Sequence, residues 1–205
     1  PVLRDRVKKM TETREIRMRQ LIERVNEVIP DRFRGAIVFE NVKRAAEGVL
    51  ARPHLAREMV KLGIVSSTGQ AFERYLVKYN VERENLDAPI AISMVRESGG
   101  VPVLAHPGER SYSLICPEKG RLPENAPVLL AELKEMGLLG LECHYPYHER
   151  TGMVDYFLDL ANSSNLIVTG SRDFHGFNTH QKVNIFGTTK MEPVFLEQFQ
   201  NVWAA

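Results

Sequence analysis

Cysteine, long apolar runs and an excess of one charge sign are all scarce in this sequence. Its 205 residues include two cysteines, Cys116 and Cys143, which lie far apart and form no CxxC pair. A disulfide framework and a thiolate zinc site therefore find no support. No run approaches the roughly 18 uninterrupted apolar residues of a membrane span, and the charged N-terminus is unlike a signal peptide. We expect a cytoplasmic protein that makes no membrane contact.

The net charge of +1 hides an asymmetry along the chain. Residues 1–60 hold 14 Lys or Arg and 9 Asp or Glu, whereas the remainder holds 13 and 17. The two parts thus carry formal charges of +5 and −4. A basic first part beside a second part rich in His and Asp suits a phosphorylated substrate that is drawn toward bound metal. A solvated helix surface is the simpler explanation for most of these charges taken singly.

The first 80 residues have the pattern of helices. Apolar residues recur at helical spacing from residue 18 to residue 29, which predicts a helix over 11–29 with Thr11 as its N-cap. Proline, glycine and capping-box signals predict further helices. These are expected over 38–48, from Pro53 to just before Gly63, and from Ser67 to Tyr79.

From residue 87 onward, helical segments alternate with short apolar runs rich in β-branched residues. The runs end near His106, Glu142 and Asp173. The helices around them are expected over 87–97, 127–136, 153–163 and 195–203. This alternation predicts βαβ units and a parallel sheet, hence an α/β fold.

Groups that can bind metal lie at the ends of two of these runs. His106 is followed directly by Pro-Gly, while Asp173 and His175 close the last run. Because the carboxyl ends of parallel strands meet at one edge of a sheet, we expect these three side chains to converge there. Imidazole together with carboxylate suits Zn, Mn or Fe.

The middle run is less decisive. Glu142 and His144 end it, and His148 follows after Tyr145-Pro146-Tyr147. Either these groups act at the same edge of the sheet, or the aromatic segment simply shapes a loop.

A second group of residues points to phosphate recognition. Arg52 and His54 flank the proline that starts a helix, and Arg57 lies one turn further along. Free backbone N–H groups and the helix dipole favour an anion at such a terminus. Taken by itself, the motif also fits a charged helix end with one buried histidine.

These segments resemble the polymerase-and-histidinol-phosphatase (PHP) superfamily. The resemblance is carried by Val103–Gly108 with His-Pro-Gly, by Gly140–Glu142, and by Val168–Gly176 with Asp-Phe-His. The motif Arg52–Arg57 is similar to the metal-dependent phosphoesterase branch, which includes nucleoside 3′,5′-bisphosphate phosphatases and 5′-to-3′ exoribonucleases. The resemblance implies part of a distorted seven-stranded βα barrel, similar to a TIM barrel, interrupted by a helical insertion. The insertion subdomain is then residues 1–85, and the C-terminal βα units of the barrel are residues 86–205.

The resemblance also implies an activity. It predicts a hydrolase that cleaves phosphate esters on nucleotides or short oligonucleotides. Its cofactors would be divalent metal ions (Mn, Zn, Mg or Fe), up to three in a complete site. The catalytic metal ligands would be His106, Asp173 and His175. The residues expected to contact substrate are Arg52, His54, Arg57, Glu142 and His144.

Three features depart from the family pattern. The family site begins with a His-x-His strand, whereas the first histidine of this sequence is His54. We therefore expect the chain to be the C-terminal part of such an enzyme, with little turnover alone and a tendency to self-associate or to pair with the missing half. Arg172 could pair with Asp173 and weaken metal binding, or could reach a phosphate. Glu109 interrupts the usual sequence after His-Pro-Gly.

Two other functions stay open. A chain that keeps the fold but lacks the complete metal site would serve as a non-catalytic metal-binding or interaction module. An amidohydrolase-like cleavage of a C–N bond would use the same metal chemistry, but it gives no role to Arg52 and His54.

Overall fold

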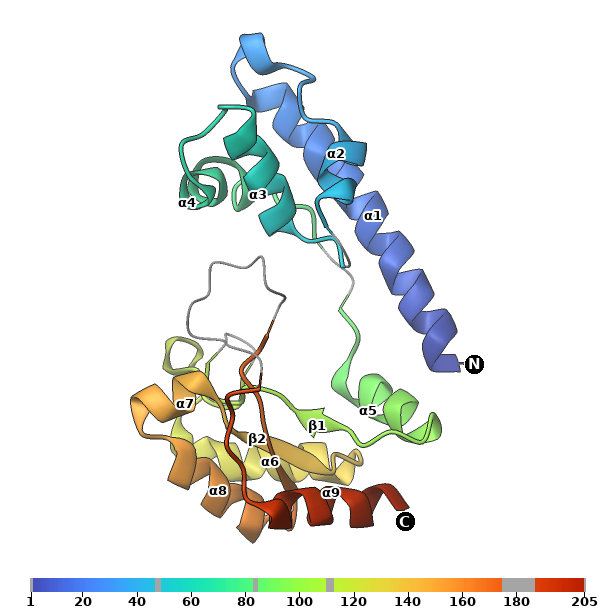
Figure 1. The fold of residues 1–205 in the computed structure, drawn as a ribbon, viewed down its shortest axis with the longest axis vertical. Coiled ribbons are helices and arrows are strands. Elements are labelled where there is room, and N and C mark those ends of the chain that lie inside the picture. The colour runs from blue at the N-terminus through green and yellow to red at the C-terminus, as the bar shows by residue number, and fades with distance from the viewer. Residues whose placement is uncertain (1, 47–48, 83–84, 110–112, 175–186, 205) are drawn as a thin grey trace. The chain divides into compact units, whose positions relative to one another are not determined.

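A computed structural model describes residues 2–46, 49–82, 85–109, 113–174 and 187–204. Over these ranges the chain forms two compact units, Pro1–Asn85 and Leu86–Ala205, and each has its own hydrophobic core (Figure 1). The first unit is helical, and the second combines helices with a sheet. Among the described helices, none combines the length and the apolar character needed to cross a membrane.

The helical unit is built from segments that share one apolar core. In chain order they are α1 (Val2–Val28), η1 (Asp31–Phe33), α2 (Phe39–Arg44), α3 (Arg52–Lys61), α4 (Thr68–Ala71) and the π-helical turn η2 (Phe72–Leu76). The largest fully buried side chains include Met18, Leu21, Leu55, Met59 and Leu76. Burying each of them stabilises the fold by roughly 1.5–3 kcal/mol relative to leaving it exposed.

Helix α1 starts earlier than the sequence predicts. Thr11 is not its N-cap, because it lies inside the helix and its Oγ1 donates a hydrogen bond to the Val7 carbonyl at 3.0 Å. A threonine hydroxyl can bond back one turn in this way without ending a helix. The predicted helix over 38–48 is also shorter, since α2 ends at Arg44.

The two remaining helix predictions in this unit are confirmed in part. Helix α3 carries proline in its first turn, and Gly63, just past its end, adopts a left-handed φ of 72°. The hydroxyl of Ser67 accepts from the Gln70 amide at 3.1 Å, as a capping box requires. The Gln70 side chain, however, accepts from the Ser66 amide at 2.9 Å, so the reciprocal bond is displaced by one residue.

The second unit is a helix-and-strand unit. Its elements are α5 (Ala88–Glu97), β1 (Val103–Leu104), η3 (Pro117–Lys119), η4 (Pro123–Asn125), α6 (Ala126–Glu135), β2 (Gly140–His144), α7 (Pro146–Thr151), α8 (Val154–Ser163), β3 (Ile167–Gly170) and α9 (Pro193–Ala204). The predicted helices 87–97, 127–136, 153–163 and 195–203 correspond to α5, α6, α8 and α9, within one or two residues at each end. Sequence analysis missed α7, because Tyr145-Pro146-Tyr147 suggested only a loop. Pro146 in fact starts that helix, with Tyr145 as its N-cap residue.

Within the described residues, the three strands form one parallel sheet in the order β1-β2-β3. Leu104 pairs with Leu141, and Leu141 pairs in turn with Val168. Helix α8 packs on β2 and β3, and α9 packs on β3. The predicted parallel α/β arrangement is therefore confirmed for this small sheet. The sequence pattern of residues 176–190 also allows one more short strand, but most of that segment lies outside the described residues.

Candidate functional site

The predicted site residues lie at one edge of the sheet. His106 follows β1 by two residues, Glu142 and His144 lie in β2, and Asp173 follows β3 by three residues. Because all three strands are parallel, their carboxyl ends point the same way. Residue His175, the remaining predicted ligand, lies outside the described residues.

Hydrogen bonds join the three strand ends. The backbone N–H of His106 donates to Glu142 Oε2 at 2.7 Å. The N–H of Ser171, just after β3, donates to the His144 carbonyl at 3.0 Å. The Asp173 N–H in turn donates to Ser171 Oγ at 3.1 Å. The edge is thus a connected set of turns rather than three independent loops.

Both turns that carry a predicted ligand have unusual backbone geometry. His106 has a φ of 36° and Asp173 a φ of 49°, in the left-handed region that most side chains avoid. Such conformations persist where the surrounding structure holds them, and they are concentrated at functional sites. Glu142 supplies part of that support at His106, since the residue is 7% exposed and its carboxylate accepts from the His106 amide.

A β-bulge separates Glu142 from His144. Glu142 pairs with Thr169 and His144 pairs with Gly170, so Cys143 is the extra residue in β2. A bulge changes the direction of the side chains that follow it. Gly170 permits the close approach of the strands, because a Cβ there would lie 2.7 Å from the His144 Cβ and 2.8 Å from the Met191 sulfur. The glycine was the sequence signal for this bulge, and sequence analysis did not use it.

His148 stabilises the His-Pro-Gly turn through a hydrogen bond to Gly108. Its fully buried imidazole accepts at Nε2 from the Gly108 N–H at 3.1 Å, and its Nδ1 lies 3.0 Å from the Cys143 carbonyl. These partners require the neutral tautomer with the proton on Nδ1. Burial lowers the pKa of His148, which keeps the ring neutral. The ring also packs on Phe157, with centroids 4.3 Å apart.

Cys143 beside it is a core residue. Its Sγ lies 3.2 Å from the Phe157 carbonyl oxygen, to which the thiol donates. Burial, together with the neighbouring Glu142 carboxylate, raises the pKa of the Cys143 thiol to about 12. The thiol therefore stays protonated at neutral pH and is a poor nucleophile or metal ligand.

Two imidazole nitrogens at this edge fit a metal. His106 Nδ1 and His144 Nε2 are buried and have no hydrogen-bond partner within the described residues. Buried polar atoms are normally paired, so an unpaired imidazole nitrogen is consistent with a ligand position. Among the described residues, however, no group of three or more His, Cys, Asp or Glu side chains is arranged to hold an ion. The assignment of His106, Asp173 and His175 as a ligand set therefore stays a prediction.

The two departures near the site have partners other than the predicted ligands. Arg172 forms an ion pair with Glu149 at 2.5 Å, and its second nitrogen donates to the Thr188 carbonyl at 3.4 Å. Glu109 accepts a short hydrogen bond from the Tyr145 hydroxyl.

The predicted phosphate-binding residues lie in the helical unit. His54 is the third residue of α3, and its Nδ1 lies 3.0 Å from the backbone nitrogen of Ala51, the N-cap residue. Burial lowers the pKa of His54, with Arg57 contributing in the same direction. The Arg52 guanidinium donates to Oδ1 of Asn80, a residue near the C-terminal end of the helical unit, at 3.3 Å. Both side chains thus have structural partners, as the simpler alternative for this motif requires.

Comparison with known proteins shows relatives in both sequence and fold. No protein-family model matches the chain. It is 36% identical over 103 residues to a 5′-3′ exoribonuclease of Haemophilus influenzae, covering 49% of this chain and 35% of that protein. It is 29% identical to the 5′-3′ exoribonuclease Rnm of Salmonella typhimurium over 85% of this chain and 56% of that protein. The chain thus spans about half the length, or less, of the curated relatives it matches.

Solved structures share the fold at lower sequence identity. A metal-dependent phosphoesterase from Bifidobacterium adolescentis matches with a TM-score of 0.69 and 24% identity, over 95% of this chain and 64% of that one. An amidohydrolase from Chromobacterium violaceum, described with bound sulfate, matches with a TM-score of 0.67 and 20% identity over the same shares. The chain is therefore similar in sequence to 5′-3′ exoribonucleases, and it shares its fold with a metal-dependent phosphoesterase and an amidohydrolase.

Proposed function

We propose that this chain is part of a metal-dependent phosphoesterase that hydrolyses phosphate esters in nucleotides or short RNA. The observation that carries the proposal is the shared sheet edge, where two buried imidazole nitrogens, His106 Nδ1 and His144 Nε2, lack a partner among the described residues. The names of the curated relatives, 5′-3′ exoribonucleases, support RNA as the substrate class. In this proposal the three strands belong to a distorted seven-stranded βα barrel, and residues 1–85 are a helical insertion.

The residues of the edge have distinct tasks in this proposal. His106, Asp173 and His175 would hold a divalent metal, which supplies Lewis-acid stabilisation of phosphate charge and a water of lowered pKa. The Glu142 carboxylate holds the His106 turn by accepting from the His106 backbone N–H, and His144, with its unpaired Nε2, ends the neighbouring strand β2. Arg52, His54 and Arg57 would bind the phosphorylated substrate from the helical unit.

The test is a hydrolysis assay on the gene product that carries these 205 residues. A short 5′-labelled RNA is incubated with Mn²⁺, Mg²⁺ or Zn²⁺, and nucleotide release is followed. We expect metal-dependent release that Asp173→Asn and His106→Asn lower by at least about 100-fold, because each removes a ligand; asparagine also tolerates the left-handed backbone. Full activity in excess chelator, or in both variants, would contradict the proposal.

The second candidate, a non-catalytic metal-binding or interaction module, has one observation in its favour. Within the described residues there is no cluster of three potential ligands. If the protein is such a module, the full-length gene product should bind Mn²⁺ but hydrolyse none of the phosphate esters tested.

A further inference from the structure

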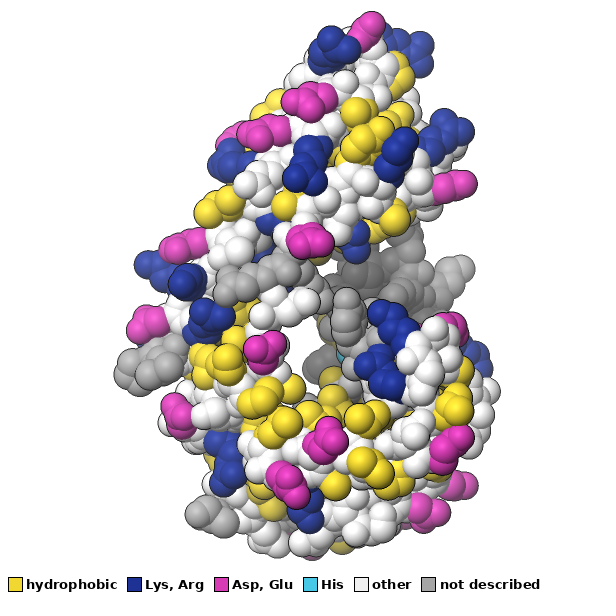
Figure 2. All heavy atoms as spheres, turned by 180° about the vertical axis from the view of Figure 1, so that it is seen from behind, with side chains coloured by type: hydrophobic (Ala, Val, Ile, Leu, Met, Phe, Trp, Pro, Cys, Tyr) yellow, Lys and Arg dark blue, Asp and Glu magenta, His cyan; other side chains and the backbone are white. Residues whose placement is uncertain are grey.

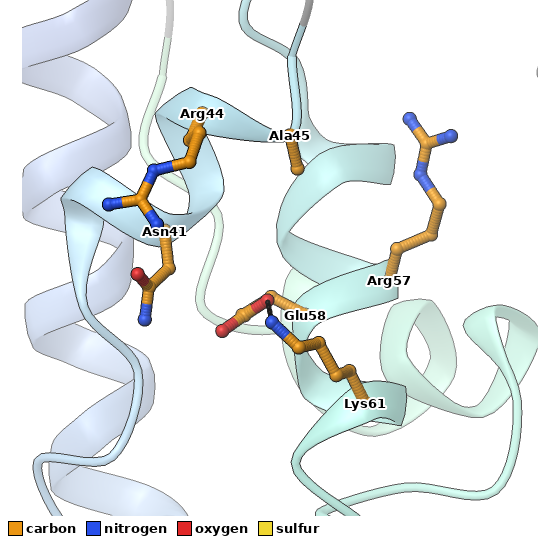
Figure 3. A pocket seen from close by; sticks show the side chains of 6 residues that line it. All are labelled: Asn41, Arg44, Ala45, Arg57, Glu58 and Lys61. Atoms are coloured by element: carbon orange, nitrogen blue, oxygen red, sulfur yellow. Dashed lines mark ion pairs between the residues drawn. The ribbon is translucent and has the colours of Figure 1, made fainter.

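The helical unit contains a pocket between α2 and α3 that is separate from the sheet edge. Its volume is about 300 Å³, and it is lined by Asn41, Arg44, Ala45, Arg57, Glu58 and Lys61 (Figure 3). We call it the α2–α3 pocket. A volume of this size lies at the lower end of the range of small-ligand sites, roughly 300–1,000 Å³.

Glu58 is the unusual residue of the α2–α3 pocket. Its side chain is 4% exposed, yet its described partner is the ammonium of Lys61 at 3.6 Å, and Lys61 is itself 73% exposed. Figure 3 shows the carboxylate directed into the space beside Asn41. Glu142, the other buried glutamate, accepts a backbone N–H at 2.7 Å. A buried carboxylate is costly unless donors bind it, so Glu58 has capacity for hydrogen-bond donors from a ligand.

Positively charged side chains line the same pocket as this carboxylate. Arg44 lines the pocket on the α2 side, whereas Arg57 extends from the opposite side of α3, away from the Glu58 carboxylate (Figure 3). Neither guanidinium has a carboxylate partner among the residues that the structure describes. On the Glu58 side, the pocket therefore presents two cations, Arg44 and Lys61, and one anion. It suits a ligand that combines an anionic group with N–H donors.

The charge of the whole unit agrees with an anionic ligand. Residues 1–85 hold 18 Lys or Arg and 12 Asp or Glu. Figure 2 shows these charges dispersed over the visible face of the unit rather than gathered in one patch. Such a dispersed positive charge favours anions in general, whereas a defined contact requires a site such as the α2–α3 pocket.

We propose that the α2–α3 pocket binds one nucleotide of the RNA substrate, with its phosphate on Arg44 and Lys61 and a guanine base on Glu58. Guanine fits because its N1–H and N2–H donors are adjacent and can bind both oxygens of one carboxylate, in the way that single-stranded bases are recognised by their Watson–Crick edges. Uracil offers a single N–H on that edge and should bind most weakly. The inference rests on the proposed function for its substrate class, and it adds a recognition site outside the metal edge.

The test uses the full chain in buffer with excess chelator, so that it does not depend on catalysis. Binding of 5′-GMP and 5′-UMP is measured by calorimetry. We expect GMP to bind more tightly than UMP, Arg44→Glu to weaken GMP binding at least tenfold, and Glu58→Gln to abolish the preference for GMP. Arg74→Glu, an exposed position of the same unit outside the pocket, is the matched control and should change affinity less than threefold.

The outcomes separate this inference from the proposed function. His106→Asn should leave GMP binding unchanged, because the pocket lies in the other unit; loss of binding in that variant would place the nucleotide at the sheet edge and overturn the inference. Equal effects of Arg44→Glu and Arg74→Glu would show general attraction only, and would also overturn it. Because Arg44 is exposed, Arg44→Glu should fold, and its GMP affinity tests the inference even if Glu58→Gln fails to fold. A protein that hydrolyses RNA but binds no GMP here retains the proposed function and loses this site.

Discussion

Replacing His148 by phenylalanine tests how the His-Pro-Gly turn is held. Phenylalanine keeps an aromatic ring against Phe157 but removes both ring nitrogens, so the Gly108 N–H and the Cys143 carbonyl lose their partner. Each buried backbone group left unpaired costs about 1–3 kcal/mol. Because the ring retains most of its packing, the two unpaired groups dominate, and we expect the free energy of unfolding of the second unit to fall by about 2–6 kcal/mol.

Two measurements check this expectation. Urea denaturation followed by circular dichroism gives the free energy of unfolding, and amide hydrogen exchange at Gly108 reports on the lost bond directly. His148→Gln is the partial rescue, because its side-chain oxygen can accept from the Gly108 N–H; it should cost less than His148→Phe and keep Gly108 protected. Tyr147→Phe, one residue away in α7, is the control. A loss below about 0.5 kcal/mol in His148→Phe, with unchanged exchange at Gly108, would refute the assigned role.

Three further predictions concern the same unit, and one concerns metal. Burial lowers the pKa of His148 in the folded state, so the unfolded chain binds more protons than the folded chain below about pH 6.5. The free energy of unfolding should therefore fall as the pH drops through that value. Between pH 7.5 and 5, the urea midpoint should decline less in His148→Gln than in the unsubstituted chain. In Gly108→Ala the new Cβ would lie 3.0 Å from His148 Nε2 and 3.0 Å from the Phe157 ring. This overpacking should lower the free energy of unfolding, measured by denaturation, by about 1–3 kcal/mol. Gly69→Ala is the control: its new Cβ would lie 3.8 Å from the nearest atom, so it should be neutral or slightly stabilising. Glu142→Ala removes the acceptor of the His106 amide and should lower the free energy of unfolding by about 1.5–3 kcal/mol. At the exposed control position, Glu135→Ala should lower it by less than about 0.5 kcal/mol. Equal losses in the two variants would contradict a specific hydrogen bond. If the unpaired, buried His106 Nδ1 is a metal ligand, His106→Asn should weaken Mn²⁺ binding, measured by elemental analysis after dialysis against limiting Mn²⁺; equal Mn²⁺ content in the variant and the unsubstituted chain would contradict that role.

The order of elements could be derived from the sequence because it depends on local patterns. Helical spacing of apolar residues located α5, α6, α8 and α9, and short β-branched runs located the three strands. The placement of polar groups at strand ends followed from the same patterns, since parallel strands bring their carboxyl ends to one edge. Helix boundaries were predicted less accurately where no strong capping signal marks them. Helix α1 begins before Thr11 because no helix-breaking residue lies between Val2 and Thr11.

The partners of the site residues were decided by the tertiary structure, because they lie far apart in the chain. The contact between His148 and Gly108 spans 40 residues, and that between Glu142 and His106 spans 36. Sequence analysis left His148 open between a binding group and a loop residue, and it expected Glu142 to contact substrate. Burial and hydrogen-bond geometry show that both support the His-Pro-Gly turn, which local spacing does not encode, while the contact of Glu142 with substrate stays a prediction.

The sequence by itself determined which residue types stand at the ends of the strands and which segments form helices, since both depend on neighbours a few positions away. The tertiary structure alone decided the bulge at Cys143, the tautomer of His148, the pairing of Arg172 with Glu149 and the burial of Glu58 beside Lys61. Each of these depends on which distant groups share a small volume, and therefore on packing, desolvation and hydrogen-bond geometry that no local pattern contains.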